Sequence, residues 1–241
     1  MGLADKRIVV IGGTSGIGLA VAQGALAEGG EVIVGSSQPA NVEAAARKLG
    51  DRASGHAVNV KDEASVEAFF AAVGPFDHLV FTAGDWGERG VRLLTVADLG
   101  AAHALYDVRY WGALAAIKHG APLIRGAGSV TLTNGMIAHR PRKGSALSTG
   151  MAGGIEHLTR GLSVDLAPIR VNAVCPGAIR TDVWNSIPAD RREEQFQRMT
   201  SRQPIARIGE PDEVAEAYLY LMKAGYTTGQ VLHVDGGGTV V

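Results

Sequence analysis

The fold of this 241-residue chain is decided near its start by the stretch Ile8-Val9-Val10-Ile11-Gly12-Gly13-Thr14-Ser15-Gly16-Ile17-Gly18. Its short apolar run is typical of a buried strand, and it breaks into glycines before a helical pattern begins. A strand that passes through glycines into a helix presents backbone N–H groups at the helix N-terminus, where the helix dipole favours an anion. The stretch therefore predicts a phosphate-binding turn after a first strand.

The spaced glycines of this stretch have separable roles. Gly12 turns the chain out of the strand, Gly16 lets the backbone approach a pyrophosphate, and Gly18 lets the helix pack closely against the sheet. The predicted cofactor-binding loop is completed by the residues between them, Thr14, Ser15 and Ile17.

Composition excludes several classes of function. The formal net charge is −1 and no basic block is present, so we expect neither nucleic acid nor a membrane as a partner. We expect the lone Cys175 to rule out an intrachain disulfide framework and a cysteine-based zinc site, and we expect no metal. The first residues form no apolar signal segment, so we expect a cytoplasmic protein.

Strand and helix patterns alternate along the whole chain, which predicts one α/β domain over residues 1–241 with a parallel sheet covered on both faces. The predicted strands cover residues 7–11, 31–36, 53–60, 77–82, 129–133, 169–174 and 230–234. The predicted helices cover residues 17–28, 41–49, 62–73, 96–125 with interruptions, 145–166, 190–199 and 211–223.

The spacing Gly12-x-x-x-Gly16-x-Gly18 resembles the short-chain dehydrogenase/reductase family, whose signature is T-G-x-x-x-G-x-G, although Ile11 stands at the Thr position. Further segments resemble motifs of the same family: 59–60, 81–84, 169–181 and 229–237. The resemblance implies a doubly wound, seven-stranded parallel sheet of Rossmann type, with strand order 3-2-1-4-5-6-7.

The resemblance also implies a nicotinamide cofactor. Besides the glycine loop, it assigns cofactor contacts to Asn59, Val60, Ala83, Gly84, Pro176, Gly177, Ile179 and Thr181. Members that use NAD carry a carboxylate at the end of the second strand, where this chain has Ser36 and Ser37. A carboxylate would repel a 2′-phosphate and hydroxyls would accept it, so we predict NADP(H). The family's usual phosphate-clamping cations are missing, since Ser15 and Ser37 occupy those positions.

The family's catalytic Asn, Ser, Tyr and Lys are all replaced. In the family, Tyr transfers the proton, Lys lowers its pKa, Ser orients the carbonyl and Asn supports a water relay. By register, these four positions carry Arg109, Gly135, Ser148 and Ala152. Two tryptophans, Trp86 and Trp184, stand in the loops with which the family covers its substrate, and we predict that they line an apolar pocket.

Two functions are compatible with this pattern. The first is an NADP(H)-dependent oxidoreductase acting on a small carbonyl or imine, in which Arg109 polarises the substrate while Asn134 and Ser148 orient substrate or water. The alternative is a catalytically inactive NADP(H)-binding sensor or partner subunit. Arg109 also has a structural interpretation, as an ion-pair partner of Asp107 or of an acidic residue across a subunit interface. Ser148 has one as a residue that bonds the backbone. The resemblance implies a homodimer or homotetramer.

Overall fold

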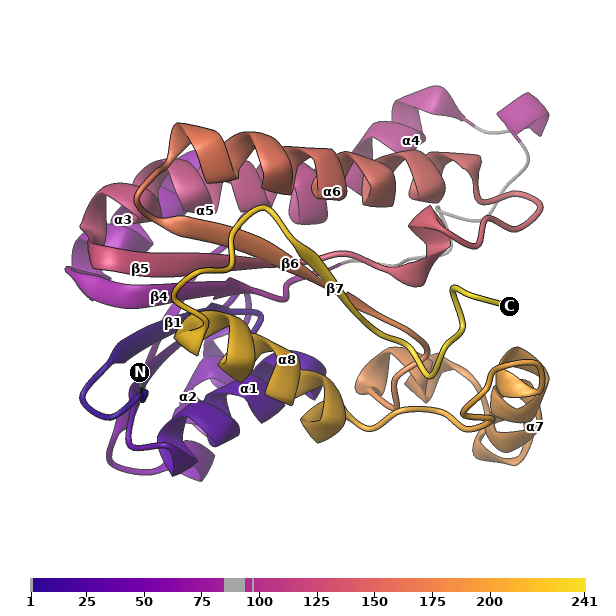
Figure 1. The fold of residues 1–241 in the computed structure, drawn as a ribbon, viewed down its shortest axis with the longest axis horizontal. Coiled ribbons are helices and arrows are strands. Elements are labelled where there is room, and N and C mark those ends of the chain that lie inside the picture. The colour runs from indigo at the N-terminus through magenta and orange to yellow at the C-terminus, as the bar shows by residue number, and fades with distance from the viewer. Residues whose placement is uncertain (1, 85–93, 97) are drawn as a thin grey trace.

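The computed structural model describes residues 2–84, 94–96 and 98–241. A parallel sheet runs through the middle of the molecule and helices cover both of its faces (Figure 1). Its strands are β1 (Arg7–Ile11), β2 (Glu31–Ser36), β3 (Ala53–Ala57), β4 (Phe76–Phe81), β5 (Ile124–Thr133), β6 (Arg170–Pro176) and β7 (Val231–Val234). The seven strands lie in the order β3-β2-β1-β4-β5-β6-β7, which confirms the predicted sheet.

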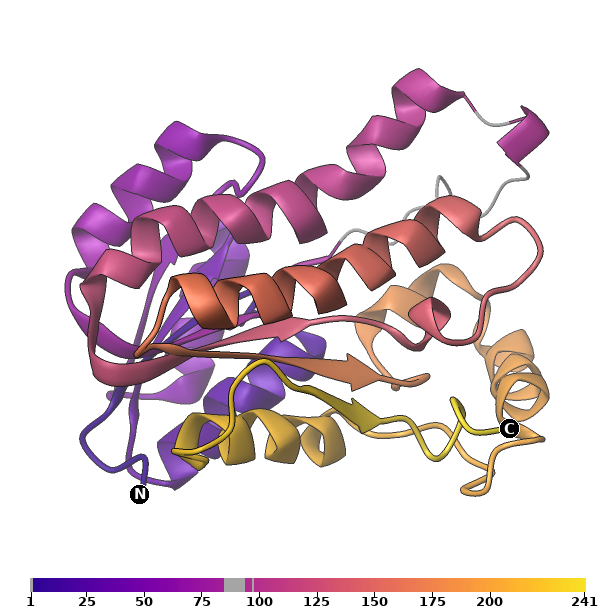
Figure 2. The ribbon, with the colours of Figure 1, turned by 45° about the horizontal axis from the view of Figure 1, so that its top comes forward.

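The helices form two layers. The main helices are α1 (Gly16–Ala27), α2 (Pro39–Leu49), α3 (Glu63–Val73), α4 (Leu99–Tyr106), α5 (Gly112–Gly120), α6 (Ala146–Asp165), α7 (Ala189–Thr200) and α8 (Pro211–Lys223). Short turns are η2 (Leu94–Val96), η3 (Asp107–Trp111, a π-helical turn), η4 (Ala121–Leu123), η5 (Met136–Ala138) and η6 (Asp182–Ser186). Helices α3, α5 and α6 cover one face of the sheet, and α1, α2 and α8 cover the other (Figures 1 and 2). The buried side chains of each group form a core against the sheet.

The glycine stretch lies at the point where the strand order reverses. Strand β1 pairs with β2 on one side and with β4 on the other, and both pairings are parallel. In an open α/β sheet, the crevice outside the carboxyl ends of the strands at such a reversal is where ligands bind. The fold therefore places Gly12 to Gly18 at the ligand-binding edge.

Two boundaries predicted from the sequence are wrong. The helical pattern assigned to residues 96–125 ends earlier, since Ile124 begins β5, where it pairs with Phe76 of β4. The strand assigned to residues 53–60 ends at Ala57, which pairs with Ser36, the last residue of β2. In both cases the boundary depends on a partner strand that is distant in sequence, and local periodicity does not report it.

Arg170, in the segment 169–181, attaches helix α8 to the sheet. Arg170 is buried and its guanidinium donates to the carbonyls of Leu221, Met222 and Ala224, at 2.6, 2.7 and 2.9 Å. These carbonyls lie at the C-terminus of α8, where the helix dipole favours a cation. Part of the resemblance in this segment therefore reflects attachment of α8 to the sheet.

Among the described helices, none combines the length and the apolar character needed to cross a bilayer.

Candidate active site

The glycine loop is packed too tightly for side chains. Gly12 has φ +89°, and a Cβ built on it would lie 2.5 Å from Ala83 N. A Cβ on Gly18 would lie closer than 3.0 Å to Gly12 O and to Thr82 Oγ1, a separation that real Cβ atoms essentially never show. The turn and the helix packing assigned to these two glycines thus have a direct steric cause.

The N-terminus of α1 has the features of an anion site. Gly16 has φ +50°, and a Cβ on it would lie 3.1 Å from Thr181 Cγ2. Ser15 is the N-cap and has extended backbone angles, but its side chain makes no capping hydrogen bond, and the first turn of α1 holds no acidic residue. The first N–H groups of a helix have no partner within it, so here they are available to a phosphate. The residues of this loop fit a dinucleotide pyrophosphate.

The ends of β2 and β3 form the adjoining part of the edge. Ser36 is half-buried and Ser37 is exposed, and α2 begins two residues further on at Pro39. Asn59 Oδ1 accepts from Lys61 N at 3.2 Å, so this side chain holds the turn after β3. A Cβ on Gly112 would lie 2.8 Å from Val60 Cγ2, so Val60 packs directly against the start of α5.

Arg109 is placed against the end of β4. It lies on the π-helical turn η3 and is 5% exposed. Irregular turns of this kind often occur at functional sites. A Cβ built on Gly84 would collide with its guanidinium, being 2.8 Å from Cζ. The Ala83–Gly84 pair therefore leaves room for this cation beside the strand end.

The guanidinium of Arg109 also reaches β5. Its Nη1 donates to Asn134 O at 3.2 Å and to Thr133 O at 3.5 Å. Burial lowers the pKa of Arg109 to about 10, while the neighbouring Tyr218 acts in the opposite direction. At neutral pH the group stays charged, so the site contains a buried cation in contact with main-chain carbonyls. These contacts place the guanidinium beside the ends of β4 and β5, and both interpretations of Arg109, as a catalytic residue and as an ion-pair partner, stay predictions.

Asn134 is fully buried at the end of β5. Its Nδ2 donates to Glu156 Oε1 at 2.5 Å, and the same oxygen lies 2.6 Å from His139 Nε2. Within the described part of the chain, Asn134 Oδ1 has no hydrogen-bond partner. A buried acceptor of this kind is commonly satisfied by an ordered water or a ligand. Glu156 was not expected from the sequence, although its position on α6, four residues after Ala152, places both on one helix face.

The first turn of α6 carries Ser148, which is buried. Ala152 follows one turn later and is also buried. Tyr106 comes from α4, and its hydroxyl donates to Leu147 O at 3.3 Å. Sequence reasoning missed this phenol, although its position three residues before Arg109 places the two side chains on the same side of a helix.

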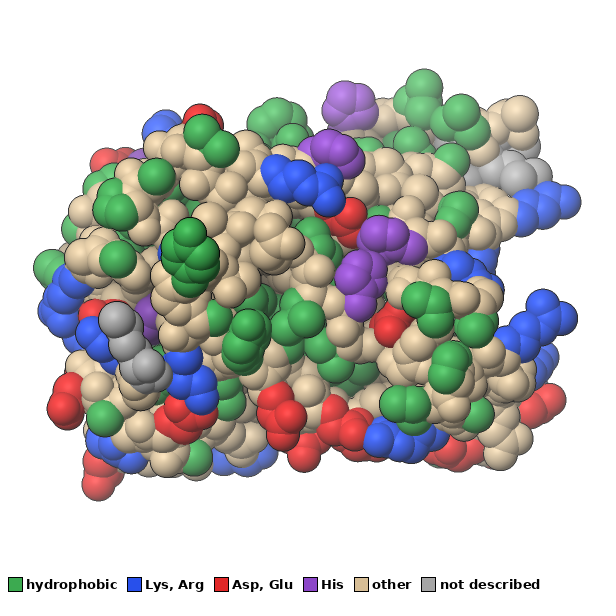
Figure 3. Space-filling model, in the orientation of Figure 1, with side chains coloured by type: hydrophobic (Ala, Val, Ile, Leu, Met, Phe, Trp, Pro, Cys, Tyr) green, Lys and Arg blue, Asp and Glu red, His purple; other side chains and the backbone are tan. Residues whose placement is uncertain are grey.

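The loop after β6 lies against the glycine loop, since a Cβ on Gly16 would lie 3.1 Å from Thr181 Cγ2. Gly177 N donates to Val234 O at 3.0 Å, which joins the end of β6 to β7. Trp184 Nε1 donates to Ile179 O at 2.7 Å, and its ring packs edge-on against Phe196 of α7. Trp184 therefore belongs to the small core beneath this loop, and Trp86 lies outside the described residues. Figure 3 shows the surface hollowed between the helical layer that contains α6 and the lobe that contains α7.

The comparisons with known proteins agree with this geometry. A family model described as enoyl-(acyl carrier protein) reductase matches residues 12–239. A short-chain dehydrogenase/reductase of Stachybotrys chlorohalonatus is 32% identical over 259 residues, which cover 98% of this chain and 97% of that protein. The chain belongs to the short-chain dehydrogenase/reductase family. Membership of this family makes it an oxidoreductase.

Two solved structures resemble this chain over nearly its whole length. A small-chain dehydrogenase in complex with NADPH is 34% identical with a TM-score of 0.85, covering 98% of this chain and 100% of that one. The MalC reductase/Diels-Alderase from Malbranchea aurantiaca is 31% identical with a TM-score of 0.90. The match covers 99% of this chain and 98% of that one. The family register that assigns Arg109, Gly135, Ser148 and Ala152 to the usual catalytic positions stays a prediction.

Proposed function

We propose that this short-chain dehydrogenase/reductase transfers a hydride between NADP(H) and a small carbonyl or imine at a site centred on Arg109. The observation that carries the proposal is the buried guanidinium beside Gly84, held by the carbonyls of Thr133 and Asn134 at the carboxyl ends of β4 and β5. This is the edge of the sheet where the glycine loop would hold the cofactor.

The choice of NADP(H) rests on the end of β2. Ser36 and Ser37 offer hydroxyls where a carboxylate would repel a 2′-phosphate. The similarity to a small-chain dehydrogenase in complex with NADPH, at 34% identity, supports the same choice.

The nicotinamide cofactor, when bound, supplies the hydride. The role of Arg109 is to donate hydrogen bonds to the oxygen that gains negative charge as a carbonyl is reduced. Its burial increases the value of this interaction because little water screens the charge. With a pKa of about 10, Arg109 remains a hydrogen-bond donor at neutral pH and does not release a proton. In this proposal Asn134 and Ser148 orient the substrate or a water molecule.

A buried cation also discriminates between substrates. It stabilises a transition state in which a neutral carbonyl becomes negative, and it disfavours the entry of an iminium ion, which is already positive. We therefore expect ketones and aldehydes to be reduced faster than protonated imines of the same shape.

The proposal is tested with the purified full chain by following the absorbance of NADPH in the presence of aldehydes, ketones, diketones and imines. Oxidation of NADPH that depends on the added compound supports it. Tight binding of NADPH without oxidation by any member of the panel would contradict it, and would favour the alternative of an inactive NADP(H)-binding regulator.

The cofactor preference gives a separate prediction. Replacing Ser36 by Asp places a carboxylate at the end of β2, and we expect the Kd for NADPH to rise about 30-fold or more, on the order of 2 kcal/mol. The Kd for NADH, which lacks the phosphate, should fall or stay unchanged. Both constants are measured by fluorescence titration.

A matched control for this variant is Ser54→Asp, which adds the same charge at an exposed position near the start of β3. It should leave both constants unchanged. An equal loss of affinity for NADPH and NADH in Ser36→Asp would overturn the preference for the phosphate.

A further inference from the structure

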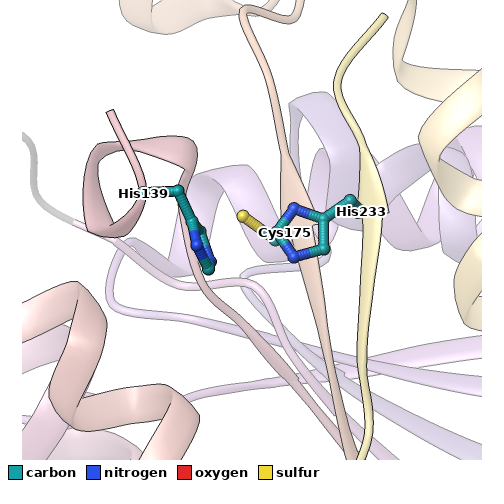
Figure 4. A group of neighbouring side chains, drawn as sticks. All are labelled: His139, Cys175 and His233. Carbon is teal, nitrogen blue, oxygen red and sulfur yellow. The ribbon is translucent and has the colours of Figure 1, made fainter. Parts of the chain in front are cut away.

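Three side chains with metal-binding atoms meet beside the active site. His139 follows η5, Cys175 lies in β6 and His233 lies in β7 (Figure 4). One ligand atom from each lies within 4.8 Å of the others. The two imidazole rings are packed edge to face, with centroids 4.6 Å apart. The sulfur is buried and both histidines reach the surface, so an ion has access from the solvent side.

We propose that His139, Cys175 and His233 bind a zinc ion. Thiolate and imidazole are the preferred zinc ligands, with Zn–S distances of about 2.3 Å and Zn–N distances of about 2.0–2.1 Å. Ligand atoms around one tetrahedral ion are therefore about 3.5 Å apart. To bind one ion, the ligand atoms, which lie within 4.8 Å of one another, must move closer together by about 1 Å. Rotation of the two exposed imidazoles supplies this movement, while the buried sulfur stays in place.

The surroundings favour a cation at this position. Glu156 Oε1 lies 2.6 Å from His139 Nε2, which is the carboxylate–histidine pairing that commonly orients a zinc ligand. This pairing leaves Nδ1 of His139 as the nitrogen for the ion.

No local sequence motif indicates this site, because its residues come from three separate segments. The sequence led us to expect no cysteine-based zinc site and no metal, because Cys175 is the only cysteine. The proposal goes against that expectation, since this group needs one thiolate and two imidazoles. The site lies next to the proposed catalytic centre, because Glu156 bonds Asn134, and Asn134 O accepts from Arg109. Three protein ligands leave a fourth position for water, as in catalytic zinc sites.

The test uses the EDTA-treated full chain without NADPH, titrated with ZnCl2 by calorimetry. We expect one ion per chain, and a loss of affinity of more than about tenfold in His139→Gln and in His233→Gln. Glu156→Gln keeps the side-chain shape and should weaken binding by about 10- to 100-fold. The control is His157→Gln, which removes an exposed histidine of α6 and should bind zinc like the natural chain.

A spectroscopic arm tests the thiolate. Cobalt(II) in place of zinc should give a thiolate-to-cobalt charge-transfer band that is absent in Cys175→Ala. Because Cys175 is buried, this variant can fail to fold. The zinc titrations of His139→Gln and His233→Gln then decide whether the site exists. Zinc affinity unchanged in His233→Gln, or weakened equally in His157→Gln, would overturn the site. Neither readout depends on turnover, so this result and that of the proposed oxidoreductase activity are independent.

Discussion

Replacing Arg109 by Ala is expected to lower kcat for NADPH-dependent reduction by about 100- to 1,000-fold, which is the usual effect of removing one donor to a developing oxyanion. The Kd for NADPH should change by less than about threefold. We expect kcat to change much more than the Kd because the guanidinium lies against Gly84, whereas the phosphate-binding features lie at the N-terminus of α1. Steady-state kinetics and a separate binding titration measure the two quantities.

Loss of structure must be separated from loss of catalysis at this position. Arg109 is 5% exposed, and its removal leaves the carbonyls of Thr133 and Asn134 without this donor, at a cost of about 1–3 kcal/mol in stability. Arg109→Met keeps most of the side-chain volume and removes the charge, so it should fold and bind NADPH but turn over slowly. Arg125→Ala, which removes a half-exposed arginine at the start of β5, serves as the control. Normal kcat in folded Arg109→Met would remove Arg109 from the mechanism.

Replacing Gly18 by Ala should weaken NADPH binding by about 100-fold or more and lower the Tm. The added Cβ would lie closer than 3.0 Å to Gly12 O and to Thr82 Oγ1, and the first of these is backbone that has no rotamer to change. Helix α1 must then shift away from the loop, which separates its N–H groups from the phosphate position. Overpacking of this kind typically costs about 1–3 kcal/mol. Calorimetry with NADPH and thermal unfolding of the same samples give both numbers.

The control for Gly18→Ala is Gly161→Ala in α6. Gly161 is exposed, and a Cβ on it meets nothing within 4 Å. Since Ala is the better helix former by about 1 kcal/mol, this variant should be as stable as the natural chain or more so. If Gly18→Ala bound NADPH with natural affinity, the close packing of α1 on the loop would have no role in cofactor binding.

Local sequence patterns were sufficient for most elements. Strands β1 and β2 and helix α8 have the predicted bounds, and Asp62 caps α3 as expected by accepting from Ala64 N at 3.1 Å. These features depend on apolar runs, on helix-capping residues and on glycines, all of which act over a few residues. The bounds of β3 and β5 were wrong because each is set by pairing with a neighbouring strand.

From the sequence alone, the resemblance of its motifs to a known family implied the strand order, which the sheet confirms, and the glycines of the first motif have steric causes at Gly12 and Gly18. The same motif predicted which end of the sheet would hold the ligand. Only the tertiary structure decided which contacts the unusual residues make. Arg109 turns to the carbonyls of β5, Asn134 bonds Glu156, and Cys175 meets two histidines from other segments. The physical reason is that side-chain direction and burial depend on packing between elements far apart in the chain, which short-range patterns do not specify.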